Sequence, residues 1–441
     1  MTEEKKRPEM SKTFKSLKLT RNPLSKTLLN MKDEQESLQT SLRATSDLTS
    51  TGKFRLNQLQ RYGKGSLAYS SLQGGMCYFM HPDYGYIAYV PLSDSYSSVC
   101  VLADPICSDD HLRPLLNEFL KERNDPVFLH VCRATAQVLS ELNFCVNELG
   151  VETFIDVQLF NLTGGKKQAL RAARNNALRD NIKVREIISV DDSLFKAFKK
   201  ISDEWLKAKV VSDSDMQFIV RPIVYVDEID VRRFVAVRND EIVGFVIFDP
   251  MYENGEVTGY LANHLRSAIQ RSYSVVDYII LEALAIFKAE GKREISLGLS
   301  PMAQVDDSDE FKHSSLLKAH FKYAFERGNY LYNFKNLYQH KIKYRPELPG
   351  AREQKVYCAM HTRFLLNRVY SVYKVLGLDP VKQTMTHMQT VAKDWLLARF
   401  GKQKNVSTAL TVAAKVQISK SEATSEEAAA DAAAKPSHKS S

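Results

Sequence analysis

The sequence predicts a mixed α/β (α+β) protein made of two similar modules in tandem, flanked by polar ends. The chain of 441 residues exceeds the size at which a single hydrophobic core usually stops growing. Hydrophobic residues make up 44% of it and charged residues 26%, an ordinary globular balance. Short apolar runs typical of strands alternate with helical patterns twice, once in 55–162 and again in 163–358.

The two ends of the chain lack any sustained apolar period. Residues 1–51 form a polar leader that we expect to be disordered. Its stretch from Met10 to Lys32 contains cations and no carboxylate, so a basic arm that contacts anionic lipid or RNA is the alternative interpretation. Residues 405–441 are interpreted as a disordered, low-complexity tail.

The first series of elements lies in 55–162. Strands are expected in four runs rich in Val, Ile, Phe and Tyr: 86–92, 97–105, 126–131 and 152–160. Helices are expected where apolar residues recur every three or four positions: 112–122 and 134–142.

The second series lies in 163–358. Helices are expected at 166–180, 193–209 and 274–291, and strands at 232–239, 241–250, 255–263 and 293–299. Asn239 and Asp240 predict a tight hairpin turn between the first two of these strands. Gly291 is expected to end the helix before the last strand in a left-handed conformation, so that this strand is reached by a helical crossover.

The crossover strand, within EISLGLSPM, carries small residues at positions where bulky ones would be expected. Ser296, Gly298 and Ser300 alternate with leucines, and Pro301 halts the ladder of hydrogen bonds. We interpret the stretch as a strand end where small side chains let a substrate approach the backbone.

Composition and missing motifs limit the function classes. A formal net charge of +9 favours an anionic partner, either nucleic acid or a membrane surface. The six cysteines form no C-x-x-C pair and are interpreted as reduced core thiols of a cytoplasmic protein. No signal peptide and no apolar run of about 20 residues is present, so we expect no transmembrane segment. Phosphate-loop, zinc-protease and serine-hydrolase motifs are missing, and neither a cofactor nor a metal is expected.

Four segments have to be considered together: LGVETFIDVQLFNLTGGKKQALRAARNNALRD, ISDEWLKAK, EISLGLSPM and LYNFKNLYQHKIKYRPE. In this order, over roughly 55–360, they resemble the C-terminal catalytic domain of phosphatidylglycerol lysyltransferases. The resemblance implies two tandem acetyltransferase-like (GNAT) modules. It also implies transfer of an aminoacyl group from aminoacyl-tRNA to a membrane lipid. Family members often follow a multi-span membrane domain, and we expect a stand-alone member here.

Two departures from the family pattern indicate a divergent subfamily. The family commonly has D-L-M-R where this sequence has NHLR, which keeps Arg266 and places Asn263 at the acidic position. After the helix that contains Trp205, the family commonly has an acidic residue and F-S-x-G, whereas this sequence has SDSDMQFIVRP. Both the amino acid and the acceptor lipid are therefore left open.

The resemblance implies catalytic roles for Asp277 and Arg266. Aminoacyl transfer from an ester needs positioning, charge and hydrogen-bond donors more than it needs chemistry from the protein. Asp277 is expected to bind the substrate α-amine or to act as a general base, and Arg266 to contact a phosphate or a carboxyl group. Compensation of the helix dipole is the alternative for Asp277, because it lies in a first helical turn.

Substrate-binding residues are expected in three places. Lys341, Lys343 and Arg345 alternate with apolar residues, so an extended segment would present them on one face as a clamp for tRNA or lipid phosphate. A second basic surface is expected around Lys167 and Arg171 on helix 166–180, with solvated surface as the alternative to anion binding. The third place is the crossover strand, where we expect Gly298 and Ser300 to line an acceptor channel opposite Arg266. His340, beside Lys341, is interpreted as a surface residue.

Residues 359–404 predict basic amphipathic helices. Packing of their apolar face on the body of the protein is the default expectation. The alternative is an interfacial helix that holds a peripheral enzyme against anionic phospholipid at the inner face of the cytoplasmic membrane.

The function predicted from these observations is aminoacyl transfer at a membrane lipid. An acyl-CoA-dependent N-acyltransferase of the same fold is one alternative. It would need a glycine-rich pyrophosphate loop, and QRSYSVV at the corresponding place has no glycine. A non-catalytic basic adaptor that binds membrane and RNA is the other alternative. The oligomeric state is left open.

Overall fold

The computed structural model describes residues 49–378, except 93–97, 124, 209–215, 217, 269–273, 307–310, 329–331 and 364. The tail 405–441 and all but the end of the leader 1–51 lie outside these residues, so both remain predictions. Within the described ranges, no helix is both long enough and apolar enough to cross a membrane.

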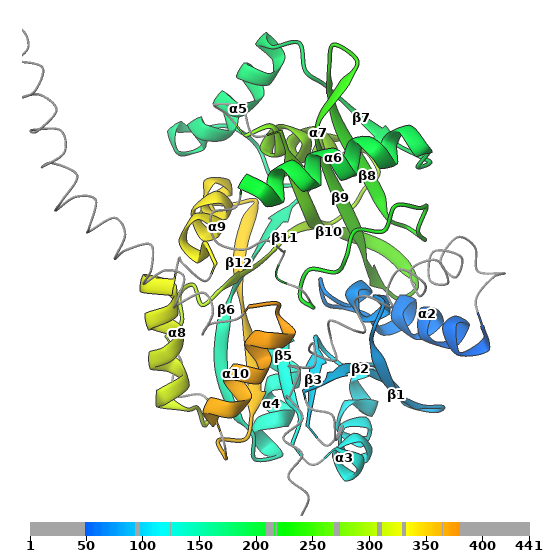
Figure 1. The fold of residues 1–441 in the computed structure, drawn as a ribbon, viewed down its shortest axis with the longest axis vertical. Helices are drawn as coiled ribbons and strands as arrows, with labels where there is room; N and C mark the ends of the chain where they lie inside the picture. The colour runs from blue at the N-terminus through cyan, green and yellow to red at the C-terminus, as the bar shows by residue number, and fades with distance from the viewer. Residues whose placement is uncertain are drawn as a thin grey trace, which may run out of the picture. The chain divides into compact units, whose positions relative to one another are not determined.

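The described residues contain twelve strands joined in one mixed sheet (Figure 1). The strands are β1 (Cys77–His81), β2 (Gly85–Pro91), β3 (Val99–Leu102), β4 (Ile106–Cys107), β5 (Val127–Val131), β6 (Cys145–Asp156), β7 (Lys183–Ile187), β8 (Arg232–Arg238), β9 (Glu241–Glu253), β10 (Glu256–Ser267), β11 (Glu294–Pro301) and β12 (Ala351–Met360). Their order in the sheet is β1-β2-β3-β5-β12-β6-β11-β10-β9-β8-β7, and β4 pairs with β2 beside this path.

Helices alternate with these strands along the chain, which confirms the mixed α/β class. They are α2 (Ser50–Tyr62), α3 (Leu112–Glu122), α4 (Arg133–Glu141), α5 (Gln168–Arg179), α6 (Asp192–Ala208), α7 (Val275–Ala289), α8 (Ser315–Arg327), α9 (Phe334–Lys341) and α10 (Leu365–Val375). The predicted hairpin turn is confirmed, since Asn239 and Asp240 have φ of 49° and 60°. Gly291 follows α7 with φ of 72°, as expected for a left-handed helix end.

The two series of elements share hydrogen bonds across the predicted module boundary. Strand β11 pairs antiparallel with β6, and β12, which comes from the end of the second series, lies between β5 and β6 of the first. The two series therefore contribute strands to one sheet, and they do not each form a separate sheet. Periodicity predicts where a strand lies in the sequence, but it does not identify the strand that will pair with it. The tandem arrangement itself and its boundaries stay predictions.

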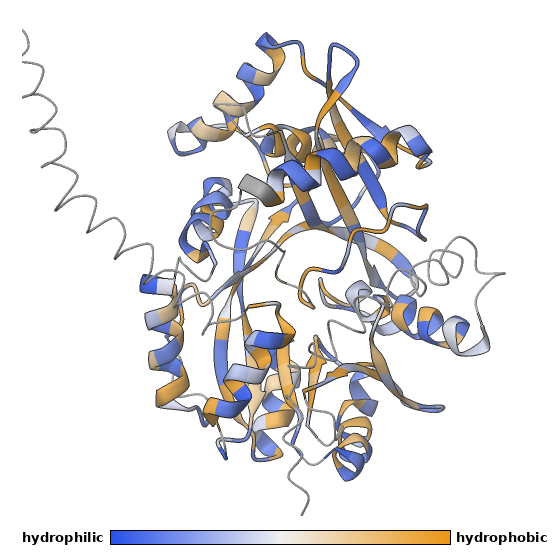
Figure 2. Ribbon diagram, in the orientation of Figure 1, coloured by the Kyte–Doolittle hydropathy of each residue, from blue (hydrophilic) through white to orange (hydrophobic). Residues whose placement is uncertain are grey.

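The sheet is covered on both faces where β8 and β9 lie. Alternate side chains of a strand point to opposite faces, and Phe234 and Phe248 pack against α7 while Val235 and Phe245 pack against α2 and α6. Figure 2 shows the apolar residues concentrated on these central strands, with hydrophilic residues on the outer side of α5 and α6. This packing on both faces holds β9 in place, and β9 in turn supports the residues at the carboxyl end of β10, with which it pairs.

Strands β10 and β11 diverge after a short parallel contact. They pair over three positions, from Gly259↔Glu294 to Leu261↔Ser296. Beyond this point β10 stays paired with β9, and β11 stays paired with β6, but the two no longer pair with each other. The carboxyl ends of two neighbouring parallel strands therefore open into a crevice, the place where α/β proteins commonly bind ligands.

Each strand at this crevice contains a β-bulge. Strand β10 is irregular between Ala262 and His264, and β11 is irregular between Ser296 and Leu299. Gly298, in the second bulge, has φ of 76°, a conformation that glycine adopts without steric cost. The run of small residues in β11 thus produces a local break in the ladder at the crevice.

Two further expectations concern packing. All six cysteines are free, as predicted, and four of them are buried. In α10, Leu365, Val372 and Tyr373 are buried in the core, which confirms the default expectation for this part of 359–404. The rest of the predicted basic helices, beyond residue 378, lies outside the described residues.

Candidate active site

A cavity of about 270 Å³ lies between the diverging ends of β10 and β11. Its wall is formed by these two strands, by α9, by the adjoining ends of α6 and α7, and by the segment around Ile219. Most of the wall is apolar. The charged, imidazole and amide side chains that the structure places in it are Asn263, Arg266, His340 and Lys341.

Lys341 is the last residue of α9 and is only 4% exposed. Its Nζ atom donates to the carbonyl oxygens of Gly298 at 2.7 Å and Leu299 at 2.6 Å, in the bulged part of β11. Burial lowers the pKa of the Lys341 amine to about 7, while the charge of Glu152 opposes this shift. A neutral amine keeps two N–H donors for the two carbonyls and has a lone pair besides. Lys341 can therefore accept a proton near neutral pH.

A buried polar network supports the strand beneath Lys341. The Ser296 Oγ atom accepts the backbone N–H of Gly298 at 2.8 Å and donates to the carboxylate of Glu152, which is 3% exposed. His130 Nε2 lies 3.6 Å from the other carboxylate oxygen of Glu152. This network fixes the bulge that presents two carbonyl groups to Lys341. The structural role of Ser296 was not predicted from the sequence.

Asp277 lies next to the cavity, behind His340. It is the third residue of α7, is 1% exposed, and its N–H donates to the capping Ser274 Oγ at 3.3 Å. Its carboxylate accepts from the Tyr344 hydroxyl at 2.9 Å and from Lys343 Nζ at 3.2 Å. The structure thus places Asp277 among protein partners and not in the cavity wall. This arrangement fits a positioning residue at a helix N-terminus.

His340 connects Asp277 to the cavity. The expectation that His340 is a surface residue is wrong, because it belongs to the cavity wall and its Nε2 atom lies 3.5 Å from Asp277 Oδ1. Burial lowers the pKa of His340, against the opposing charge of Asp277. The sequence contained one indication that His340 belongs to the site, namely its position next to Lys341. It did not show that the end of α9 directs both side chains toward the cavity.

Arg266 is in the cavity wall, as expected. It is 5% exposed, lies on β10 and stacks on the Trp205 ring, with 3.7 Å between the guanidinium carbon and the ring centroid. Stacking on an indole fixes the guanidinium plane, and the Nη1 atom of Arg266 donates to the carbonyl oxygen of Leu265 at 3.2 Å. Gly298, on the β11 side, also lines the cavity, whereas Ser300 is fully buried and is not among its lining residues. The expectation for Ser300 is thus corrected.

The predicted basic clamp is not formed. Residues 341–345 are not extended, because α9 continues to Lys341 and a 3-10 turn, η5 (Ile342–Tyr344), follows directly. The three cations therefore separate. Lys341 contacts β11, Lys343 contacts Asp277, and the Arg345 Nε atom donates to the carbonyl oxygen of Lys166 at 2.7 Å.

Lys167 and Arg171 do not form the predicted basic surface. Lys167 is buried, donates to the Asn161 carbonyl oxygen at 2.7 Å and lies over the Phe160 ring. Arg171 donates to the carbonyl oxygens of Leu162, at 2.8 Å, and Gly164. Both side chains satisfy backbone carbonyls of the turn before α5, which is a structural role. Neither residue lines the cavity.

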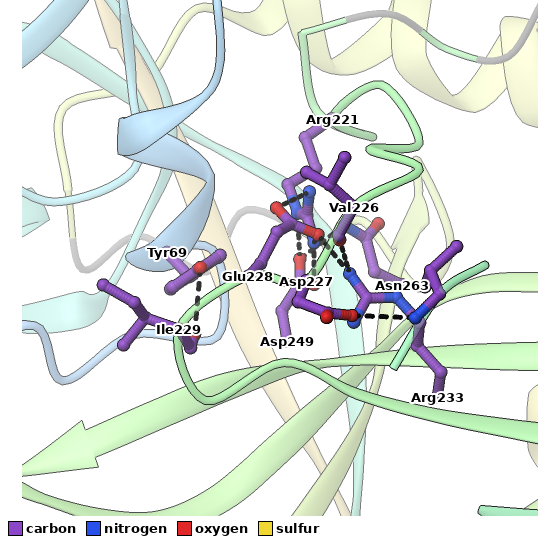
Figure 3. Close-up of polar contacts among 10 residues, drawn as sticks. Tyr69, Arg221, Val226, Asp227, Glu228, Ile229, Arg233, Asp249 and Asn263 are labelled. Atoms are coloured by element: carbon purple, nitrogen blue, oxygen red, sulfur yellow. Dashed lines mark hydrogen bonds and ion pairs between the residues drawn. The ribbon is translucent and has the colours of Figure 1, made fainter. Parts of the chain in front are cut away.

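A buried ion network beside the cavity was not predicted from the sequence (Figure 3). Arg221 donates to Asp249, with Nε 2.7 Å from Oδ2, and to Glu228, with Nη1 2.8 Å from Oε1. Arg233 also donates to Glu228, at 3.0 Å, and Asn263 donates to Asp249 at 2.6 Å. Two cations thus balance two carboxylates. The network anchors the segment that contains Ile219 and Val220, both of which line the cavity. The one feature of the sequence that pointed to this ion network was Asp249, a carboxylate that follows the apolar run from Phe245 to Phe248.

No group of three or more His, Cys, Asp or Glu residues able to hold a metal ion is found in the part of the chain that the structure describes.

Comparison with known proteins gives a consistent result. The family model of the C-terminal region of phosphatidylglycerol lysyltransferase matches residues 56–359. The phosphatidylglycerol lysyltransferase of Bacillus subtilis is 27% identical over 261 residues, which cover 57% of this chain and 29% of that protein. The enzyme of the same name from Staphylococcus aureus is 25% identical over 296 residues, which cover 65% of this chain and 34% of that protein. The chain thus spans about a third of the length of the curated relatives it matches.

Two solved structures are similar in fold. L-PGS from Bacillus licheniformis superposes with a TM-score of 0.60 at 20% identity, covering 73% of this chain and 95% of that one. The C-terminal domain of a putative lysylphosphatidylglycerol synthetase from Agrobacterium fabrum gives 0.57 at 17% identity, covering 74% and 96%.

Proposed function

The chain belongs to the family of the phosphatidylglycerol lysyltransferase C-terminal domain, and from this premise we propose that it is an aminoacyltransferase. The proposed reaction moves an aminoacyl group from aminoacyl-tRNA to a hydroxyl group of a phosphatidylglycerol-like lipid. The observation that carries the proposal is Lys341, a buried amine with a lowered pKa in the wall of a cavity that also contains Arg266. Family membership favours this reaction over the acyl-CoA-dependent alternative.

The Lys341 amine supplies the proton transfer that this reaction needs. The lipid hydroxyl oxygen attacks the carbonyl carbon of the aminoacyl ester, and the hydroxyl proton passes to Lys341 Nζ. The bond between the carbonyl carbon and the tRNA ribose oxygen then breaks, and the ribose oxygen takes a proton from Lys341. One ester is exchanged for another with no change of oxidation state. General acid and base catalysis of this kind typically contributes 10²- to 10⁴-fold.

Arg266 supplies charge for the phosphate of the acceptor or for the oxyanion that develops in the transition state. Its stacking on Trp205 holds the guanidinium group in a fixed plane, so less conformational entropy is lost when an anion binds. His340 lies next to Lys341 in the same wall, with Nε2 3.5 Å from Asp277 Oδ1 and Nδ1 3.4 Å from Lys343 Nζ, so that it links Asp277 and Lys343 to the cavity. The aminoacyl ester is already activated, so the mechanism uses no cofactor.

The partners and location follow from the same proposal. The donor is aminoacyl-tRNA, the acceptor lies in an anionic phospholipid surface, and the enzyme acts at the inner face of the cytoplasmic membrane. The net charge of +9 supports contact with both anionic partners.

The proposal is tested with the purified full chain, phosphatidylglycerol vesicles and tRNA charged with a radioactive amino-acid mixture. We expect labelled lipid in the organic extract, and no labelled lipid when the charged tRNA is digested with RNase first. Lys341→Met should lower the initial rate about 100-fold or more. The matched control is Lys166→Met, because Lys166 is exposed and does not line the cavity, and its rate should be unchanged. No labelled lipid from any aminoacyl-tRNA would contradict the proposal.

A further inference from the structure

We propose that Asn263 is a specificity-determining residue of this cavity, and that with Arg266 and Lys341 it selects an aminoacyl group whose side chain is uncharged. This inference rests on the proposed function and concerns which aminoacyl-tRNA the cavity accepts. It departs from the lysyl group named for the curated relatives.

The orientation of the Asn263 amide is fixed by its partner. Asn263 Nδ2 lies 2.6 Å from Asp249 Oδ2, and an ionised carboxylate can only accept hydrogen bonds. The nitrogen must therefore face Asp249, and the amide oxygen Oδ1 points away from it. Because Asn263 belongs to the cavity wall and sits in the β10 bulge, it contributes an uncharged hydrogen-bond acceptor to the cavity.

Asp249 is held in place independently of Asn263. It is fully buried, and both its oxygens accept from Arg221. Arg221 is in turn held by Glu228, which also accepts from Arg233 (Figure 3). Any rotation of the Asn263 amide would place its oxygen against the Asp249 carboxylate. The acceptor is thus preorganised by a network whose own charges cancel.

The charges in the wall disfavour a cationic side chain. The cationic residue that the structure places there is Arg266, on the β10 side of the cavity, and Lys341, on the α9 side, becomes a second cation once it has taken the proton of the acceptor hydroxyl. A lysyl or arginyl group would bring a further cation into the same cavity as these groups, and like charges at short range repel. The Asn263 oxygen can accept from the α-amine of any aminoacyl ester, but it adds no negative charge to offset that repulsion.

The remaining wall offers apolar contact. Leu261, Leu265, Val276, Leu297 and Leu299 line the same space. Small or apolar aminoacyl side chains bury surface against these residues without introducing charge. The cavity therefore combines an oriented acceptor for the amine with an apolar lining for the side chain.

The experiment measures kcat/KM for single aminoacyl-tRNAs, charged with alanine, leucine, lysine or arginine, on phosphatidylglycerol vesicles with the full chain. We expect alanyl or leucyl transfer to exceed lysyl and arginyl transfer by at least tenfold. Asn263→Asp should move the ratio of lysyl to alanyl transfer at least tenfold toward lysine, since the new carboxyl group shares a proton with Asp249 in the empty cavity and ionises when a lysyl ammonium group binds beside it. Asn239→Asp, an identical change in the exposed hairpin turn, is the matched control and should leave the ratio unchanged.

The outcomes separate the two proposals. If the wild-type chain transfers lysyl or arginyl groups with a higher kcat/KM than alanyl or leucyl groups, this inference is overturned. The aminoacyltransferase proposal then stays intact. An unaltered ratio in a folded Asn263→Asp variant, checked by circular dichroism, also overturns it. If that variant does not fold, the substrate order of the wild-type chain decides alone. No transfer from any aminoacyl-tRNA overturns both proposals.

Discussion

Replacing Lys341 by methionine is expected to flatten the pH dependence of the free energy of unfolding. Burial lowers the pKa of this amine from 10.5 to about 7 in the folded protein. At about 1.4 kcal/mol for each pH unit, the shift corresponds to about 5 kcal/mol between the two protonation states. The effect is large because the side chain is 4% exposed, so solvent screens it little.

The sign follows from proton counting. Below pH 7 both the folded and the unfolded chain bind the proton at Lys341, so this residue adds no pH dependence. Between pH 7 and 10.5 the unfolded chain binds one proton more than the folded chain, and the free energy of unfolding rises with pH. From pH 7.5 to 9.5 the contribution of Lys341 is about 2.5 kcal/mol.

The assay is urea unfolding followed by circular dichroism at pH 7.5, 8.5 and 9.5. Lys341→Met also leaves the carbonyl groups of Gly298 and Leu299 without their donor, so the comparison uses the change with pH and not the absolute stability. Other titrating groups, including the buried thiols, contribute equally to wild type and variant. Lys166→Met, at an exposed position, should retain the wild-type pH dependence. Equal pH dependence in wild type and Lys341→Met would refute the reasoning.

Three further predictions concern the residues around the cavity. The rate of aminoacyl transfer should rise with pH around an apparent pKa near 7, because the Lys341 amine becomes neutral there. Glu152→Gln should move this midpoint to lower pH, because it removes a charge that raises the pKa of Lys341. Initial rates between pH 5.5 and 9 measure both effects, and an unmoved midpoint would exclude this role for Glu152. Ser296→Ala should destabilise the fold by about 1–3 kcal/mol, seen as a lower urea midpoint, since it leaves two buried polar groups without a partner. Arg221→Met should cost about 3–5 kcal/mol because it leaves Asp249 buried without its cation and Glu228 with Arg233 alone. Arg179→Met, on the exposed side of α5, is the control for Arg221 and should unfold at the wild-type urea concentration.

The elements of the fold were largely predictable because they depend on local patterns. The period of apolar residues located α7, and a capping serine and a glycine with positive φ define its two ends. The Asn239–Asp240 pair was enough to predict the hairpin turn between β8 and β9. Such signals are encoded in residues near one another in the chain, where backbone conformation and capping decide the structure.

The site was predicted in part. Arg266 and Gly298 lie in the cavity wall as expected, because short motifs at a strand end identified them. The alternation of Lys341, Lys343 and Arg345 was misinterpreted as a strand face, since a two-residue period in a short segment does not exclude a helix end. What each cation does depends on the partner it meets, and those partners are distant in the sequence.

By itself, the sequence determined the α/β class, many of the elements in order along the chain, and the resemblance to a family of lipid aminoacyltransferases. Only the tertiary structure decided that β12 inserts between β5 and β6, that Lys341 is buried against the β11 bulge, and that Arg221 joins Asp249 beside Asn263. The physical reason is that strand pairing, desolvation and charge balance are set by contacts between distant segments. Those contacts turn a row of small residues in β11 into the wall of a cavity and shift the pKa of a lysine toward neutrality.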